Sequence, residues 1–355
     1  MASLRRTGIL TAAAAAPVAL AYRFAVEYRA RAGFPAQLPP AHDPAELGLA
    51  YEHLVIRSGD ASLPGWFIPA RGGASGPGVV LVHGWESARD RTLPDAAILN
   101  AIGLHVLAFD VRGNGENPAE RLPITAGEYG ADALAAVRAL LDRPEVTSVG
   151  IVGHSMGGVG ALIAASREPR VAATVSVAAP ADPYRLTRLT FRLAHLPLPA
   201  PIAIPLAWIT AVVFLRPRGH AMADVSAARA AARYRGPLLL LQGDADDVVP
   251  TDHLSRLAAA ARRARAEAPG PSAAVRVATI PGGEHSWLYE HAAYRRVVAA
   301  FLAEALGGPL TPADAADRGE SVDARRFPEP DGLTALDSGP VGGRALVGVV
   351  LPNRR

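Results

Sequence analysis

The chain has 355 residues, of which 50% are hydrophobic and 19% are charged, and its formal net charge is +3. This length and hydrophobic content favour one large domain with extra segments over two full domains. The absence of cysteine excludes disulfides and any site that uses a cysteine nucleophile or metal ligand. The absence of lysine excludes Schiff-base chemistry and a lysine general base.

The basic excess lies at the N-terminus. Residues 1–31 contain five arginines and one glutamate, a net charge of +4, whereas the whole chain carries +3, so the remainder carries −1. A near-neutral body without a basic stripe argues against a nucleic-acid partner.

The first 32 residues are expected to form a signal or membrane-anchor helix. Arg5 and Arg6 precede an apolar stretch over residues 7–22, which is shorter than the roughly 20 residues of a comfortable transmembrane helix. The stretch matches the core of a signal peptide, and residues 19–21 offer a cleavage site. Residues 22–31 continue without a helix breaker, which argues against cleavage. Export after cleavage, a retained membrane anchor and a soluble helix all remain open, and a cytoplasmic location is the less favoured one.

The body of the chain alternates short apolar runs with helical patterns. Residues 33–49 are proline-rich and are expected to be a linker before a domain that spans residues 50–306. The expected strands are 51–56, 65–68, 79–82, 105–109, 149–152, 171–177, 238–241 and 275–280, the first two forming an antiparallel pair. The expected helices are 92–101, 127–141, a small-residue stretch after residue 155, and 289–306. This order predicts an α/β fold with a doubly wound, mostly parallel sheet that binds ligands at the carboxyl ends of its strands.

Two further segments flank or interrupt this pattern. Residues 181–236 separate two expected strands by far more than a usual connection of about 2–6 residues, so a helical lid insertion is expected there. Prolines break its apolar stretch 196–215, which argues against a membrane-spanning helix. The lid either covers its own pocket or, with Arg185, Arg188 and Arg192 at helical spacing, also touches a membrane surface. Residues 307–355 are expected to be a mostly disordered tail.

A serine flanked by glycines stands between an expected strand and an expected helix. The stretch is Gly153-His154-Ser155-Met156-Gly157, after the apolar run 149–152. A sharp turn at the serine requires small residues two positions before and after it, and such a turn presents the hydroxyl at the edge of the sheet. A serine hydroxyl attacks well only when a base removes its proton and an acid orients that base.

This G-x-S-x-G stretch resembles the nucleophile elbow of the α/β-hydrolase superfamily, and the resemblance extends over residues 50–306 in the order of the motifs. It is closest to the serine-aminopeptidase-like and prolyl-oligopeptidase-like branch. The resemblance implies that Ser155 is the nucleophile, Asp246 the acid and His285 the base, because the family places its acid and histidine in loops after late strands. Asp244, Asp247 and Asp182 remain alternative acids.

The resemblance also implies an oxyanion hole. Its donors are expected to be the backbone amides of Met156 and of Trp85, the latter in the sequence His83-Gly84-Trp85. Glu86 is unusual so close to a developing anion, and its side chain is expected to point away. The candidates for contact with substrate are Trp85, His154, Phe191 and Trp208.

The implied activity is that of a serine hydrolase that cleaves a carboxylic ester through an acyl-serine intermediate, without a metal or a cofactor. The alternative within enzymes is a peptidase or amidase of the serine-aminopeptidase type, for which Glu86 and Glu284 are candidate amine ligands. The alternative from another class is a non-catalytic, membrane-tethered scaffold. The expected partners are a small ester or amide and a membrane touched by the N-terminal helix and the lid. The sequence sets neither the acyl chain length nor the oligomeric state.

Overall fold

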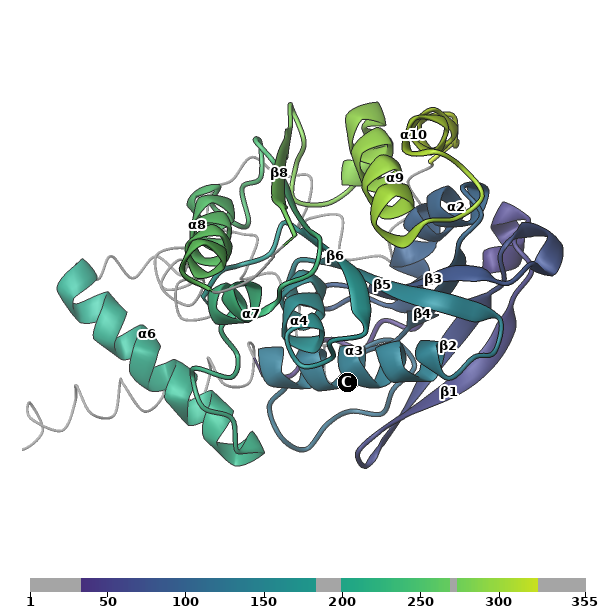
Figure 1. Cartoon of the computed structure of the whole chain (residues 1–355). Coiled ribbons are helices and arrows are strands. Elements are labelled where there is room, and N and C mark those ends of the chain that lie inside the picture. Colours follow the sequence, from purple (N-terminus) through teal and green to yellow (C-terminus); the bar gives the residue numbers. More distant parts are fainter. Residues whose placement is uncertain (1–32, 183–198, 269–272, 325–355) are drawn as a thin grey trace, which may run out of the picture.

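Eight strands form a single sheet with helices on both faces, as a computed structural model of residues 33–182, 199–268 and 273–324 describes it (Figure 1). Three predictions lie outside these described residues. They are the signal or anchor helix at 1–32, the lid positions 185–192 with Phe191, and the last 31 residues of the predicted tail, 325–355.

The sheet has the order β1-β2-β4-β3-β5-β6-β7-β8. The strands are β1 Glu52–Ser58, β2 Ala61–Ile68, β3 Gly76–Val82, β4 His105–Phe109, β5 Val146–His154, β6 Val171–Val177, β7 Leu238–Gly243 and β8 Val275–Ile280. The β1–β2 and β2–β4 pairs are antiparallel, and all the other pairs are parallel. The predicted doubly wound, mostly parallel sheet is therefore confirmed.

Helices cover both faces of the sheet. The helices are α2 Leu93–Ala101, α3 Ala126–Leu141, α4 Met156–Ala165, α6 Ala200–Leu215, α7 Ala227–Arg233, α8 Asp252–Glu267, α9 Ala292–Leu306 and α10 Pro312–Glu320. Buried side chains of α3, α4, α7 and α8 form one apolar core, and those of α2, α9 and α10 form the other.

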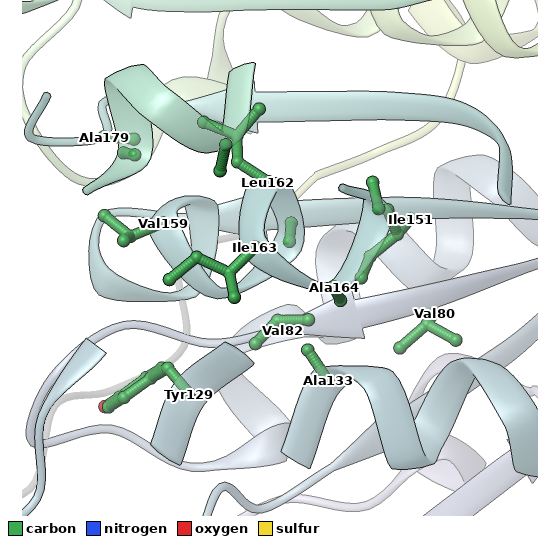
Figure 2. Close-up of a cluster of buried hydrophobic side chains, with 14 of the residues drawn as sticks. Val80, Val82, Tyr129, Ala133, Ile151, Val159, Leu162, Ile163, Ala164 and Ala179 are labelled. Carbon is green, nitrogen blue, oxygen red and sulfur yellow. The ribbon is translucent and has the colours of Figure 1, made fainter. Parts of the chain in front are cut away.

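The central strands supply both cores because successive side chains of a strand point to opposite faces. In β3, Val80 and Val82 join the α3–α4 side, whereas Val79 and Leu81 join the α2–α9 side. All four are at most 2% exposed. Figure 2 shows Val80 and Val82 lying between the sheet and the residues of α3 and α4. Burial on both faces is what makes these strands continuous apolar runs in the sequence.

The carboxyl ends of the parallel strands are aligned. Val82 at the end of β3 pairs with Gly153 of β5, and Val177 at the end of β6 pairs with Leu241 of β7. Gly243 at the end of β7 pairs with Ile280 at the end of β8. The loops that follow β3, β5, β7 and β8 therefore leave the sheet at one edge, where side chains far apart in sequence can meet.

Four features differ from the sequence-based expectations. The predicted linker contains a capped 3-10 turn, Pro44–Leu47. Helix α8 was not singled out, although its buried face includes Leu254, Leu257, Ala258 and Ala261. The start of the predicted tail is ordered as α10, whose Ala315 and Gly319 pack toward α9. The apolar stretch of the lid is not broken by Pro205, because α6 continues through it.

The described part of the predicted lid comprises α6 and α7 with the turn Arg216–Arg218 between them. Helix α7 is anchored by its buried residues Ala227, Ala230 and Ala231. Helix α6 projects from the body of the molecule (Figure 1) and leaves Trp208, Ile209 and Val213 more than half exposed. Among the helices of the described residues, none combines the length and the hydropathy that crossing a membrane requires.

Candidate active site

Ser155 stands at a sharp turn between β5, which ends at His154, and α4, which begins at Met156. Its backbone has φ 53° and ψ −119°, a region that residues with a side chain rarely adopt. A Cβ on Gly153 would lie 2.2 Å from the carbonyl oxygen of Gly157. A Cβ on Gly157 would lie 2.1 Å from the carbonyl oxygen of Val82. Glycine is therefore required on both sides of the serine, and the turn stores the local strain that is typical of reactive positions.

His285 and Asp246 form a buried pair in the loops after β8 and β7. The imidazole Nδ1 lies 3.0 Å from Oδ2 and 3.1 Å from Oδ1 of the carboxylate, and each residue is 8% exposed. Because the carboxylate accepts, Nδ1 carries the hydrogen and Nε2 is the basic nitrogen. The pair thus presents a base whose orientation is fixed by an acid.

The carboxylate of Asp246 is itself held by three other donors. Its Oδ1 accepts from the amides of Val248, at 3.0 Å, and Val249, at 2.8 Å, and its Oδ2 accepts from Gln242 Nε2 at 3.1 Å. Burial alone would raise the pKa of Asp246. The hydrogen bond and charge of His285, with the hydrogen bonds from the Val249 amide and Gln242, outweigh burial and hold this pKa below its usual range. Asp246 is therefore ionised when it faces the imidazole.

The three alternative acids make other contacts. Asp244 is exposed and its Oδ1 accepts from the amide of Gly282 at 2.7 Å. Asp247 is exposed, and partial burial raises the pKa of its carboxyl. Asp182 lies 3.5 Å from the hydroxyl of Ser226 in the insertion. The carboxylate that the structure places against His285 is that of Asp246.

His154 connects the serine turn to the histidine loop. Its Nε2–H donates to the backbone carbonyl of His285 at 2.7 Å, and the centroids of the two rings lie 4.9 Å apart. Burial, together with the nearby charge of His285, lowers the pKa of His154 to about 4. A neutral His154 therefore fixes the His285 loop beside the residue that precedes Ser155, a supporting contact that the sequence did not indicate.

The loop after β3 passes beside the serine. A Cβ on Gly84 would lie 3.4 Å from Ser155 Cβ and 3.5 Å from His154 Nδ1, which are ordinary contact distances, so Gly84 lies directly against the serine turn. Trp85 follows, partly buried, with its ring stacked on that of Tyr129 at a centroid distance of 6.5 Å. Met156 is the first residue of α4, and the first amides of a helix have no acceptor within the helix. Trp85 and Met156 thus each directly follow a residue of the contact between Gly84 and Ser155.

Glu86 and Trp208 complete the predicted positions. Glu86 has φ 50°, and its Oε1 accepts from the amide of Ala36 at 3.2 Å, so its side chain reaches the segment that leads into the domain. Burial raises the pKa of the Glu86 carboxyl, and hydrogen bonds from Ala36 and the Trp85 indole oppose this rise. Trp208 is 52% exposed on α6. Among the described residues, no group of three or more acidic, histidine or cysteine side chains is arranged to hold a metal ion.

Two residues at the site escaped the sequence analysis. Gln242 orients the carboxylate, and its signal is a polar residue at the end of the apolar run Leu238–Leu241. Tyr129 touches the loop after β3, and its signal is the capping box of Thr125 and Glu128, which begins α3 and so puts Tyr129 in the first turn. Both signals become informative only when the strand and helix bounds are known.

Comparisons with known proteins agree with this fold. The family model described as "Alpha/beta hydrolase family" matches residues 79–300. An uncharacterized protein of Mycobacterium tuberculosis is 28% identical over 236 residues, which cover 66% of this chain and 72% of the relative. A shorter match, 34% identical over 101 residues, links 28% of this chain with 30% of an sn-1-specific diacylglycerol lipase of Xenopus tropicalis.

Solved structures show the same fold at low sequence identity. An esterase of Pyrococcus furiosus is 22% identical with a TM-score of 0.60, and the match covers 78% of this chain and 98% of the esterase. An acylaminoacyl peptidase of Pyrococcus horikoshii is 18% identical with a TM-score of 0.55, and the match covers 77% of this chain and 45% of the peptidase. With a family model matched over most of the chain, and with the sheet and the serine turn already described, the protein belongs to the alpha/beta hydrolase family.

Proposed function

We propose that the protein is a serine hydrolase that cleaves a carboxylic ester. The observation that carries the proposal is the buried Asp246–His285 pair, with Nδ1 and Oδ2 3.0 Å apart, at the sheet edge where Ser155 occupies a strained turn. The contact of His154 with the His285 carbonyl joins the two halves of this arrangement. A base oriented by an acid, together with a half-buried serine at the same edge of the sheet, is the machinery of acyl transfer. The similarity to an esterase and to a diacylglycerol lipase supports the same reaction class.

In the proposed reaction, Ser155 Oγ attacks the ester carbonyl carbon while His285 Nε2 takes the hydroxyl proton. Asp246 holds the imidazole in the tautomer that can accept this proton and stabilises the imidazolium. The amides of Trp85 and Met156 donate to the oxyanion of the tetrahedral intermediate, each such donor being worth about 3 kcal/mol. Collapse breaks the bond to the alcohol, which takes the proton from His285. Water then repeats the sequence on the acyl-serine and releases the acid.

The test is Ser155→Ala, with fluorophosphonate labelling and the hydrolysis of short p-nitrophenyl esters as readouts. The variant removes the attacking oxygen, so labelling is expected to disappear and turnover to fall by several orders of magnitude, while thermal unfolding changes little. Ser286→Ala is a matched control, since Ser286 follows His285 directly but is not the proposed nucleophile. Ser155→Ala that keeps its turnover would refute the proposal.

A panel of acyl esters of increasing chain length and aminoacyl amides separates the remaining enzyme classes. A preference for amides would replace the esterase by a peptidase or amidase that uses the same residues. A wild-type chain that neither labels nor turns over any member of the panel would favour the scaffold.

We also propose that α6 contacts the surface of an anionic membrane. Its residues Ala200–Leu215 include no charged side chain, Trp208, Ile209 and Val213 are each more than half exposed, and the exposed Arg216 follows directly. An apolar surface with an aromatic ring and a flanking cation suits the bilayer interface. Replacing the three exposed residues by serine is expected to weaken sedimentation with phosphatidylglycerol vesicles. Unchanged sedimentation would remove the contact from α6.

A further inference from the structure

The carbonyl of Gly84 is held by two side chains that the proposed reaction does not use. Tyr129 donates its hydroxyl hydrogen to this carbonyl at 3.0 Å, and His83 Nδ1 lies 2.7 Å from it. The other ring nitrogen of His83, Nε2, accepts from the amide of Val111 at 3.0 Å. Because an amide can only donate, Nε2 bears no hydrogen, so Nδ1–H is the donor to Gly84. Two donors from different elements therefore fix one carbonyl.

Fixing this carbonyl also fixes the next amide. No peptide bond in the described residues is cis, so the N–H of Trp85 points opposite to the C=O of Gly84. The carbonyl points into the protein toward Tyr129 and His83, whereas Gly84 itself lies against Ser155. Within the part of the chain that the structure describes, the Trp85 amide donates to no acceptor. This N–H therefore points away from Tyr129 and His83 and has no acceptor among the described residues.

We propose that Tyr129 and His83 are positioning residues that hold the Gly84–Trp85 peptide in the orientation required for the oxyanion hole. The inference rests on the proposed serine hydrolase function. Glycine has no side chain to resist rotation of its peptide planes, and a rotated Gly84–Trp85 peptide would turn a carbonyl oxygen toward the developing anion. Such an orientation would replace attraction by repulsion at the reacting oxygen.

The two positioning residues are themselves rigid. Tyr129 is fully buried in the first turn of α3, and a Cβ on Gly160 of α4 would lie 2.9 Å from its backbone carbonyl, so the two helices are in close contact there. Figure 2 shows its ring extending from α3 at the edge of the cluster that includes Val159 and Ile163. Burial raises the pKa of Tyr129 well above its usual value and lowers that of His83. Tyr129 therefore keeps its hydroxyl hydrogen, and His83 stays neutral.

The test compares Tyr129→Phe with Tyr234→Phe. Both variants delete one buried hydroxyl that donates to a backbone carbonyl, but Tyr234 donates to Val171 at the start of β6, the end of that strand remote from Ser155. Tyr129→Phe is expected to lower kcat about 10-fold with KM within about 2-fold, since removing an oxyanion donor outright costs about 10²–10³. Tyr234→Phe is expected to leave both constants unchanged.

A second readout isolates the oxyanion. Ser155 Oγ attacks the carbonyl carbon of a trifluoromethyl ketone and forms a tetrahedral adduct whose oxygen is charged. The inhibition constant of this compound should therefore rise in Tyr129→Phe by about the same factor as kcat falls. A second pair of variants is independent of Tyr129. His83→Asn keeps an N–H donor for the Gly84 carbonyl, whereas His83→Leu keeps none. The kcat of His83→Leu should therefore be at least about 10-fold lower than that of His83→Asn.

The outcomes separate this inference from the proposed function. Ester turnover that depends on Ser155 and is unchanged in Tyr129→Phe and in both His83 variants would overturn the positioning role and leave the hydrolase standing. A loss of the same size in Tyr234→Phe would attribute the effect to stability and would also overturn it. Wild-type turnover that does not depend on Ser155 would overturn the proposed function, and this inference with it.

Discussion

Replacing Asp246 by asparagine should invert the tautomer of His285. In the wild type, Oδ1 of Asp246 accepts from two backbone amides, those of Val248 and Val249. The asparagine carbonyl oxygen must take that place, because an NH₂ group there would face two donors. The NH₂ group then replaces Oδ2, which lies 3.0 Å from His285 Nδ1. Nδ1 must become the acceptor, so the proton moves to Nε2, which can no longer take a proton from Ser155.

The expected loss in kcat is about 10³–10⁴, the size of the effect that a wrong imidazole tautomer has in serine-histidine-aspartate enzymes. At about 1.4 kcal/mol for each factor of ten, this corresponds to about 4–5.5 kcal/mol of transition-state stabilisation. The new NH₂ group also faces Gln242 Nε2, which is 3.1 Å from Oδ2 in the wild type. This contact between two donors should reduce the free energy of unfolding by about 1–3 kcal/mol.

The assay is hydrolysis of a short p-nitrophenyl ester at saturating concentration, with urea unfolding of the same variants. Asp247→Asn is the matched control, since Asp247 is adjacent and exposed and was an alternative acid. Its kcat should stay within about 3-fold of the wild type, the size of an ordinary surface substitution. Asp246→Asn with more than a tenth of the wild-type kcat, or a larger loss in Asp247→Asn, would refute the assignment of the acid.

Two further predictions concern stability. Gly157→Ala places a Cβ 2.1 Å from the carbonyl oxygen of Val82, so it should reduce the free energy of unfolding by about 3 kcal/mol or more. Gly76→Ala is the control, because its Cβ meets nothing within 4 Å and should not destabilise the chain. Equal unfolding midpoints for the two variants would contradict this prediction. Burial raises the pKa of Asp95 from 3.8 to about 6, so between these values the folded chain keeps a proton that the unfolded chain releases, and stability falls as the pH rises through this range. Asp95→Asn, which can still accept from Tyr294, should therefore raise stability at pH 7.5 by up to about 3 kcal/mol and change it little at pH 4, and an equal gain at both values would be inconsistent with this reasoning.

The sheet was predictable because its strands are buried on both faces. Runs such as 79–82 and 238–241 contain no polar residue, and this pattern is typical of a parallel sheet covered by two layers of helices. Helix α8 was harder to identify because two of its five buried residues are alanines, Ala258 and Ala261, which do not stand out in an alanine-rich chain. Helix α10 is short and polar on its outer face, so its identity as an ordered element depends on its packing against α9.

Helix α6 is continuous although it contains a proline in its interior. Proline interrupts a helix by removing an N–H donor and by crowding the preceding turn. Pro201 lies in the first turn, where the N–H would have no acceptor within the helix, so it costs little. Pro205 lies deeper and does remove a hydrogen bond, yet the helix runs on to Leu215. The spacing of prolines alone therefore did not predict the end of the element.

The residues that form the candidate site differ in how they could be found. The turn at Ser155 is specified by its immediate neighbours, because both glycines are required by contacts within a few residues of the serine or with the adjacent strand. Asp246 and His285 follow their strands directly, so the strand pattern locates them. Tyr129 lies 44 positions after Trp85, in a helix that packs closely on α4, and its hydroxyl donates to the carbonyl of Gly84. The capping box of Thr125 and Glu128 gives the place of Tyr129 in α3, but no local signal indicates its contact with the Gly84 carbonyl, which depends on where α3 packs.

This difference also indicates where specificity and rate can change without loss of the fold. The elbow glycines tolerate no side chain, so this turn cannot vary. The orientation of the Trp85 amide, by contrast, depends on two hydrogen bonds to a single carbonyl, each worth about 1 kcal/mol to stability. A substitution at Tyr129 or His83 can therefore change the oxyanion hole while the sheet and the Asp246–His285 pair stay intact. If the proposed oxyanion hole is correct, intact side chains at Ser155, Asp246 and His285 do not by themselves establish an active enzyme, because residues outside the motifs set the amide that would face the anion.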